Sequence, residues 1–190
     1  TSLVAQFSFN ENGTGIQSPT NTASGNYSTA MGYGTTASGD SATAMGLNAT
    51  ASGTNSTAMG AETIASGTYS TAMGIFTKAS GDASTAMGYN TQASGYYSTA
   101  SGRATTAEDY LSFVIGVHNK TDETPNPNEF SFENTAFVIG NGGFINGDFI
   151  GTDESRSNAF EVLFDGTTTI AGNVTAPAFI GDGSQLTNLP

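Results

Sequence analysis

Few residues of this chain are of a type that performs covalent chemistry. Its 190 residues include no cysteine and a single histidine, His118, which opens a polar segment. A lone histidine in a loop is typical of a solvated side chain rather than a catalyst, and no group of Asp, Glu and His has the spacing of metal ligands. The sequence therefore predicts a protein that is not an enzyme and that has no cofactor and no metal site.

The charged residues exclude another class of partner. The chain has 16 acidic and four basic residues, which gives a net charge of −12. So few Lys and Arg residues cannot line a phosphate backbone, so we expect no nucleic-acid partner. The acidic pairs Asp122–Glu123 and Asp153–Glu154 are interpreted as solvated loops, with weak cation binding as the alternative.

Five tyrosines are the best candidates for surface recognition, and they fall at regular intervals. Tyr27, Tyr69 and Tyr97 are separated by multiples of 14 residues, and so are Tyr33 and Tyr89. An exposed tyrosine offers an apolar ring and a polar hydroxyl, which suits it to binding. The alternative interpretation is that these rings only cover the edge of a repeating structure.

The interval of the tyrosines is the period of the chain itself. The motif Ala-Ser-Gly-x-x-Ser-Thr-Ala-Met-Gly-x-x-Thr-x recurs every 14 residues over residues 23–106. Copies begin at Ala23, Ala37, Ala51, Ala65, Ala79 and Ala93, and a seventh, drifted copy begins at Ala107. A fixed short period is typical of a solenoid. We therefore expect an all-β solenoid with two strands per coil and a rise of about 4.8 Å per coil.

Small residues define the predicted interior of each coil. Numbered from the first Ala, positions 1, 3, 6, 8 and 10 carry almost only Ala, Gly and Ser. Residues two apart in a strand share a face, so positions 1 and 3 would meet positions 6, 8 and 10 across a narrow core.

The opposite face of the second strand carries two other columns. Position 7 is Thr in six copies and position 9 is Met in five, and these are all the methionines of the chain. Either methionine fills the interior, or the columns form an apolar stripe along an oligomer axis, which the small-residue interior favours. The predicted axis column consists of Thr29, Thr43, Thr57, Thr71, Thr85, Thr99, Met31, Met45, Met59, Met73, Met87, Phe113 and Ile115.

The run Ser-Thr-Ala-Met-Gly, alternating with Ala-Ser-Gly, resembles the head repeat of YadA-type trimeric autotransporter adhesins over residues 23–116. That resemblance implies a left-handed parallel β-roll, three chains around a threefold axis, and a second strand facing the axis. Thr and Met stand here where the family often has Val and Ile, which makes the predicted axis softer and more polar.

The sequence divides into four segments. Residues 1–22 are a lead-in strand and turn, 23–116 the β-roll, 117–172 an insertion loop plus a β-hairpin region, and 173–190 a linker. Residues 137–140 repeat the phrase Phe-Val-Ile-Gly of the seventh coil, which predicts an eighth strand beside it. Asp165-Gly166 predicts a hairpin turn.

Two further resemblances concern the C-terminal segment. Residues 137–142 and 156–163 resemble a segment of Bacteroidota surface proteins. Residues 179–189 resemble the linker upstream of an intramolecular chaperone domain in phage-tail-fibre-like proteins. The chain starts without Met and is interpreted as part of a longer protein.

Together these features predict an adhesive module of a trimeric cell-surface fibre. The predicted location is extracellular. The chain is expected to form a homotrimer, and this segment is not expected to insert into a membrane. The alternative is a receptor-binding or spacer segment of a phage-like tail fibre.

Overall fold

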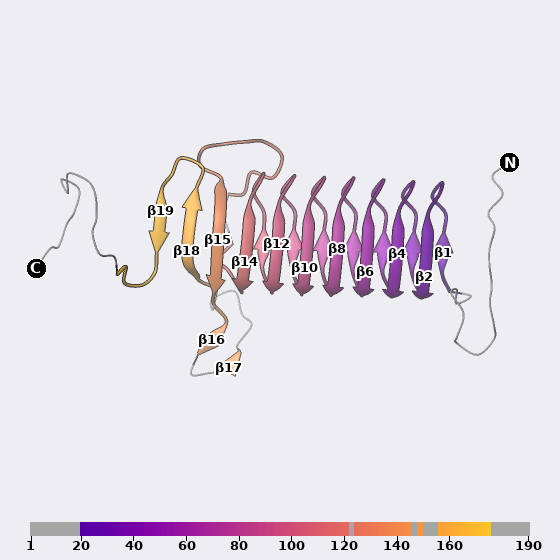
Figure 1. Cartoon of the computed structure of the whole chain (residues 1–190), viewed down its shortest axis with the longest axis horizontal. Coiled ribbons are helices and arrows are strands. Elements are labelled where there is room, and N and C mark those ends of the chain that lie inside the picture. The colour runs from indigo at the N-terminus through magenta and orange to yellow at the C-terminus, as the bar shows by residue number, and fades with distance from the viewer. Residues whose placement is uncertain (1–19, 122–123, 146–147, 150–155, 176–190) are drawn as a thin grey trace, which may run out of the picture.

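The chain forms a parallel β-solenoid that continues at its C-terminal end into an antiparallel hairpin (Figure 1). The computed structural model describes residues 20–121, 124–145, 148–149 and 156–175. Residues 1–19 of the predicted lead-in (1–22) and residues 176–190 of the predicted linker (173–190) lie outside the described residues.

Each coil contains one two-residue strand and one five-residue strand. The short strands begin at position 14, where Thr or a longer residue precedes the Ala of the next copy: β1 Thr22–Ala23, β3 Thr36–Ala37, β5 Thr50–Ala51, β7 Ile64–Ala65, β9 Lys78–Ala79, β11 Gln92–Ala93 and β13 Thr106–Ala107. The long strands run from position 7 to position 11: β2 Thr29–Tyr33, β4 Thr43–Leu47, β6 Thr57–Ala61, β8 Thr71–Ile75, β10 Thr85–Tyr89, β12 Thr99–Arg103 and β14 Phe113–Val117.

The two kinds of strand stack into separate sheets. The short strands form a seven-stranded parallel sheet in the order β1 to β13. The long strands form a second sheet, which we call the long sheet. From β2 to β14, each residue pairs with the residue 14 positions later in the next coil; Met45 pairs with Met59, for example. The long sheet extends past the coils through β15 Thr135–Asn141, β18 Asn158–Leu163 and β19 Thr168–Ile170, to ten strands in all. A separate two-stranded ribbon joins β16 Phe144–Ile145 to β17 Asp148–Phe149.

The interior differs from the prediction at two of the fourteen positions. The Ala residues at positions 1 and 8 are buried as expected, except Ala23 in the first coil, which is half-buried. Position 10 is not buried: Gly32, Gly46 and Gly88 are exposed, the other glycines there are half-buried, and all have φ between 101° and 131°. Position 13, which the sequence reasoning left out, is buried instead, as Thr35, Thr63 and Thr77 show. The interior therefore contains threonine as well as Ala, Gly and Ser.

Each coil turns at two residues in the left-handed region of backbone space. They occupy positions 5 and 12, with φ between 47° and 66°. Asn and Gly adopt this conformation readily, but here it is also taken by Tyr69, Phe76 and Ala83. Turn composition alone therefore does not reveal these corners.

The C-terminal strands confirm two predictions. β15 pairs in parallel with β14 and places Phe137 beside Phe113. β18 and β19 form an antiparallel hairpin around Asp165 and Gly166. At that turn, hydrogen bonds from the backbone and side chain of Thr167 lower the pKa of the Asp165 carboxyl.

The loop between β14 and β15 folds back along the coils rather than standing in solvent. The N–H of Tyr96 donates to the carbonyl of Pro127, and the N–H of Tyr110 donates to that of Asn126. The interpretation of His118 as a solvated side chain is wrong. His118 occupies position 12 of the seventh coil, is buried, and donates its backbone N–H to the carbonyl of Arg103.

Candidate assembly face

The predicted axis columns lie on the outer side of the long sheet, which we call the assembly face. In each long strand the residue at position 8, which is Ala or, in β14, Val114, is buried, and the residues on either side of it, at positions 7 and 9, point the other way. All five methionines are half-buried in the single chain, as are five of the six threonines; Thr29, in the first coil, is exposed. The methionines therefore do not fill the interior of their own coil.

Strand register makes the face continuous. Parallel pairing sets Met31, Met45, Met59, Met73 and Met87 in one row and the threonines in a second row beside it. Neither row contains a charged residue, although the chain carries a net charge of −12. The methionine row is interrupted by a polar residue at Ser101 and resumes at Ile115.

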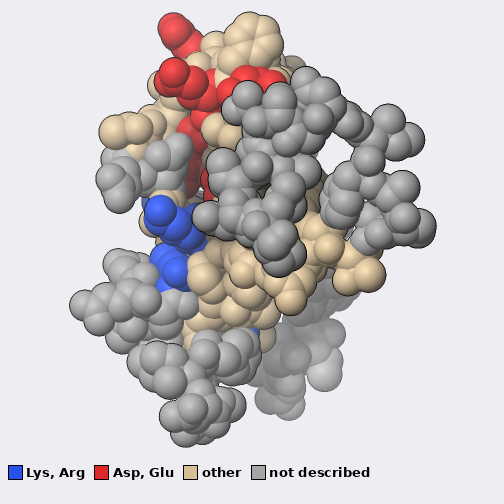
Figure 2. Space-filling view, turned by 90° about the vertical axis from the view of Figure 1, so that its left-hand side faces the viewer, with Lys and Arg blue, Asp and Glu red and all other residues tan. Residues whose placement is uncertain are grey.

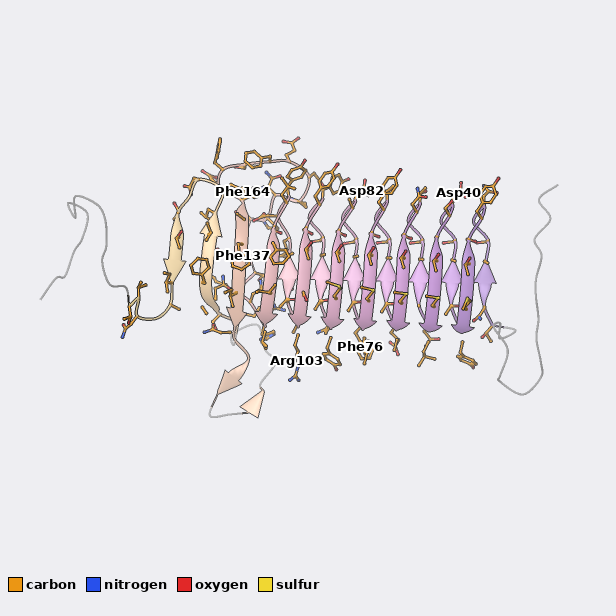
Figure 3. The ribbon with its side chains drawn as sticks, viewed as in Figure 1. Asp40, Phe76, Asp82, Arg103, Phe137 and Phe164 are labelled. Carbon is orange, nitrogen blue, oxygen red and sulfur yellow. The ribbon has the colours of Figure 1, made fainter. Side chains whose placement is uncertain are left out.

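The candidate tyrosines lie on two opposite edges of the roll and are all exposed. Tyr27, Tyr69 and Tyr97 occupy position 5 at one turn, on the edge where Asp40 and Asp82 are seen in Figure 3. Tyr27 is the most open of them, with 94% of its surface exposed. We call this set the turn tyrosines.

Tyr33 and Tyr89 end their strands at position 11, toward the opposite edge, where Phe76 and Arg103 lie in Figure 3. They share this row with the exposed Leu47 and Ile75. The guanidinium carbon of Arg103 lies 5.8 Å from the centre of the Tyr89 ring, and Phe76 meets the same ring edge-on at 5.9 Å. This row is therefore partly engaged in contacts within the chain.

Sequence reasoning missed an aromatic cluster that joins the loop between β14 and β15 to the residue after β18. Phe130 packs edge-on against Phe132 at 5.3 Å and against Phe164 at 5.1 Å between ring centres. Phe132 is 66% exposed. Eleven of the 12 Phe lie outside the repeats of residues 23–106, which is a signal for aromatic packing, but nothing in the local sequence joins residues 130 and 164.

The C-terminal end also holds a cavity of about 480 Å³, where the short-strand sheet stops at β13 and the long sheet continues. Val114, Val138 and Leu163 line it together with Glu108 and Glu161. Figure 2 shows this end of the molecule, with Asp and Glu side chains gathered over one side and the few Lys and Arg in a separate group.

Within the described ranges, no three His, Asp or Glu side chains come together as a metal site would require. The same part of the chain contains no helix long and apolar enough to cross a membrane. The acidic pairs at 122–123 and 153–154 lie outside the described residues.

These features define a class: a short-coil parallel β-solenoid with one uncovered, uncharged sheet face. A family model, the YadA head domain repeat, matches the chain in seven overlapping stretches that run from residue 19 to residue 116. They cover just over half of the 190 residues, and the chain belongs to this family of trimeric autotransporter-like adhesin heads. No curated protein matches the chain.

Proposed function

We propose that three copies of the chain assemble around the assembly face, and that the assembled roll is an adhesive module of an extracellular cell-surface fibre. The observation that supports this proposal is the pair of uncharged Thr and Met rows, half-buried in the single chain and in register from coil to coil. Rows of this kind are stabilised when another apolar surface covers them.

The interior of the roll supplies a second argument. It consists mostly of Ala, Gly, Ser and Thr, whose burial removes little apolar surface from water. Among the described residues, eight buried Ser and Thr hydroxyls have no hydrogen-bond partner, which adds a cost to folding. Because ordering the backbone costs about 1–2 kcal/mol per residue, a contribution from association is needed.

The geometry of the rows suits an axis that runs along the solenoid. Each coil presents the same residue types at one height, so Met59 of one chain can meet Met59 of two others in a closed cyclic arrangement. The number three comes from the family to which the repeats belong.

A charge placed in the methionine row tests the assembly. Met59→Asp would bring three carboxylates together in an apolar row, at a cost of several kcal/mol, so we expect the trimer to dissociate near pH 7. The measurement is sedimentation velocity over a range of chain concentrations. The control is Ile64→Asp, because Ile64 is an exposed residue of β7 in the other sheet. Dissociation of both variants, or of neither, would show that the long sheet does not face the axis.

The adhesive role is assigned to the turn tyrosines, which are exposed on one edge of the roll, although Tyr97 also meets the ring of Tyr110 edge-on at 5.5 Å. The third coil has Asn55 at their position, with a φ of 57°, so Tyr→Asn there keeps a residue suited to the turn. We expect the triple variant Tyr27→Asn, Tyr69→Asn and Tyr97→Asn to remain folded and to lose most binding to the surfaces that the native chain coats. Ala83→Asn, at the same position of the fifth coil, is the control. Equal binding by the native chain and the triple variant would remove the tyrosines from the attachment surface.

The tail-fibre alternative is a different setting for the same module. It depends on residues 179–189, which lie outside the described residues. It predicts the same assembly and differs in which particle carries the fibre.

A further inference from the structure

The assembly face does not end where the YadA head repeats end. Beyond residue 116, strand pairing sets Phe137 beside Phe113 and Ile139 beside Ile115. The antiparallel strand β18 then adds Val162 opposite Phe137 and Phe160 opposite Ile139. Paired residues share a face of a sheet, so both rows continue across three strands although the strand direction reverses.

The character of the face changes at the same point from Thr and Met to aromatic. The rings of Phe113 and Phe137 stack with their centres 5.8 Å apart and their planes 16° from parallel. Phe137 in turn meets Phe160 at 6.0 Å and 61°. We call Phe113, Phe137 and Phe160 the aromatic base; Figure 3 labels Phe137 on the long sheet.

The opposite side of the same strands shows that this is a true outer face. Val114 and Val138 alternate with the aromatic base and are each 2% exposed. Phe113, by contrast, is 44% exposed, and Ile170, paired with Phe160 from β19, is 43% exposed. The single chain therefore leaves part of this aromatic surface open to water.

The charge distribution separates this surface from its surroundings. Twelve of the 16 acids of the chain follow residue 107, because only Glu11, Asp40, Glu62 and Asp82 precede it. None of the residues that continue the two rows through β14, β15, β18 and β19 is charged. An apolar face kept free of charge in the most acidic part of the chain is typical of a surface covered by protein.

We propose that the aromatic base is the main contact that holds the three copies together, and that its occupants are the same faces of the two other chains. This inference rests on the proposed trimer. The occupant is a second copy rather than an unrelated partner because the aromatic base continues, in register, the Thr and Met rows that the proposed trimer already covers. Phenylalanine buries a large apolar area and packs in preferred ring geometries. The aromatic bases of the three chains therefore stabilise the trimer more than one coil of Thr and Met from each chain does.

A matched pair of substitutions tests this inference. Phe113 and Leu111 are 44% and 43% exposed and two residues apart, but Leu111 lies at the turn edge, with a φ of 62°, which Asp tolerates. We expect Phe113→Asp to raise the chain concentration at which half of the trimer dissociates by about a hundredfold or more, and Leu111→Asp to leave it unchanged. Phe113→Ala should also weaken the trimer more than Met59→Ala does.

The outcomes separate this inference from the proposed function. If Met59→Asp dissociates the trimer while Phe113→Asp behaves as Leu111→Asp does, the trimer stands and the aromatic base is not part of it. If Phe113→Ala weakens the trimer less than Met59→Ala does, the aromatic base is not the main contact. If the native chain is a folded monomer, the proposed trimer and this inference are both wrong.

A second measurement decides the case in which Phe113→Asp does not fold. The native chain has no cysteine, so Phe113→Cys and Leu111→Cys each introduce one reactive thiol. Facing sheets lie roughly 10 Å apart, a span that a short bismaleimide bridges. We expect linked chains on a denaturing gel for Phe113→Cys and none for Leu111→Cys. Absence of linked chains from Phe113→Cys, in a sample that sediments as a trimer, would overturn the inference.

Discussion

Glycine at position 3 of the coil is required by the distance between neighbouring coils. A Cβ atom added to Gly67 would overlap the carbonyl oxygen of Gly81 in the next coil, and the same clash recurs at Gly25, Gly39 and Gly53. The seventh coil has Asp109 at this position, and among the described residues no strand joins the short-strand sheet after β13. A side chain at position 3 would clash inside the stack but is therefore accommodated in the last coil, as Asp109.

The clash predicts a large effect of one methyl group. We expect Gly67→Ala to lower the free energy of unfolding by about 3 kcal/mol, because two stacked backbones would have to move apart. Gly172→Ala should change it by less than about 0.5 kcal/mol, because no atom of the described residues lies within 4 Å of the added atom. Denaturant titration at a fixed chain concentration measures both. A mild effect of Gly67→Ala would mean that the coils are farther apart than described.

At this scale the sequence showed that glycine was required, but not always why. Position 3 was correctly placed in the interior. Position 10 was placed there by alternation alone, whereas Gly46 adopts a φ of +121° and is exposed. Alternation assumes a regular strand and fails where the backbone takes a conformation that only glycine allows.

At the scale of elements, asparagine side chains close both ends of the roll. Asn21 and Asn119 occupy position 13, where interior coils have a buried Thr or Ala. Asn21 accepts from the N–H of Thr35 and donates to the carbonyl of Gly32. Asn119 accepts from the N–H of Thr106 and donates to the carbonyl of the same residue. A side-chain amide thus replaces the peptide group of a missing coil.

Asp109 binds the loop between β14 and β15 to the seventh coil. Its two carboxylate oxygens, which are buried, accept from the N–H groups of Asn126 and Thr135. We expect Asp109→Ala to cost about 2–4 kcal/mol, because two backbone donors lose their acceptor. Asp40→Ala removes an exposed acceptor of the Asn26 N–H and should cost less than about 1 kcal/mol. Hydrogen exchange at Thr135 reports the change, and unchanged protection in Asp109→Ala would contradict this role.

The elements themselves were largely predictable. The 14-residue period set the number of coils, and the repeated Phe-Val-Ile-Gly phrase predicted the β14–β15 pairing. The course of the loop between them was not predictable, because backbone hydrogen bonds from Tyr96 and Tyr110 to residues 126 and 127 fix it. Backbone groups are the same in almost every residue, so residue types do not reveal such contacts.

At the scale of the whole molecule, the hydrogen bonds between the strands of the coils run along the solenoid, from one coil to the next. Strand pairing joins each interior coil to the coils before and after it, as in other solenoids, and the thin interior offers little apolar burial. The assembly face is an uncharged surface that could supply more when another chain covers it. Its Thr and Met rows were visible in the sequence because they recur, while the aromatic base emerged only when strand pairing joined residues 113, 137 and 160.

The mass of the native chain in solution tests the central claim most directly. Sedimentation equilibrium at micromolar chain concentration should give three times the chain mass of 19.3 kDa, with no folded monomer at equilibrium. A single species at 19.3 kDa with the β-sheet circular dichroism of a folded solenoid would contradict the account, because the assembly face would then be stable in water without a partner.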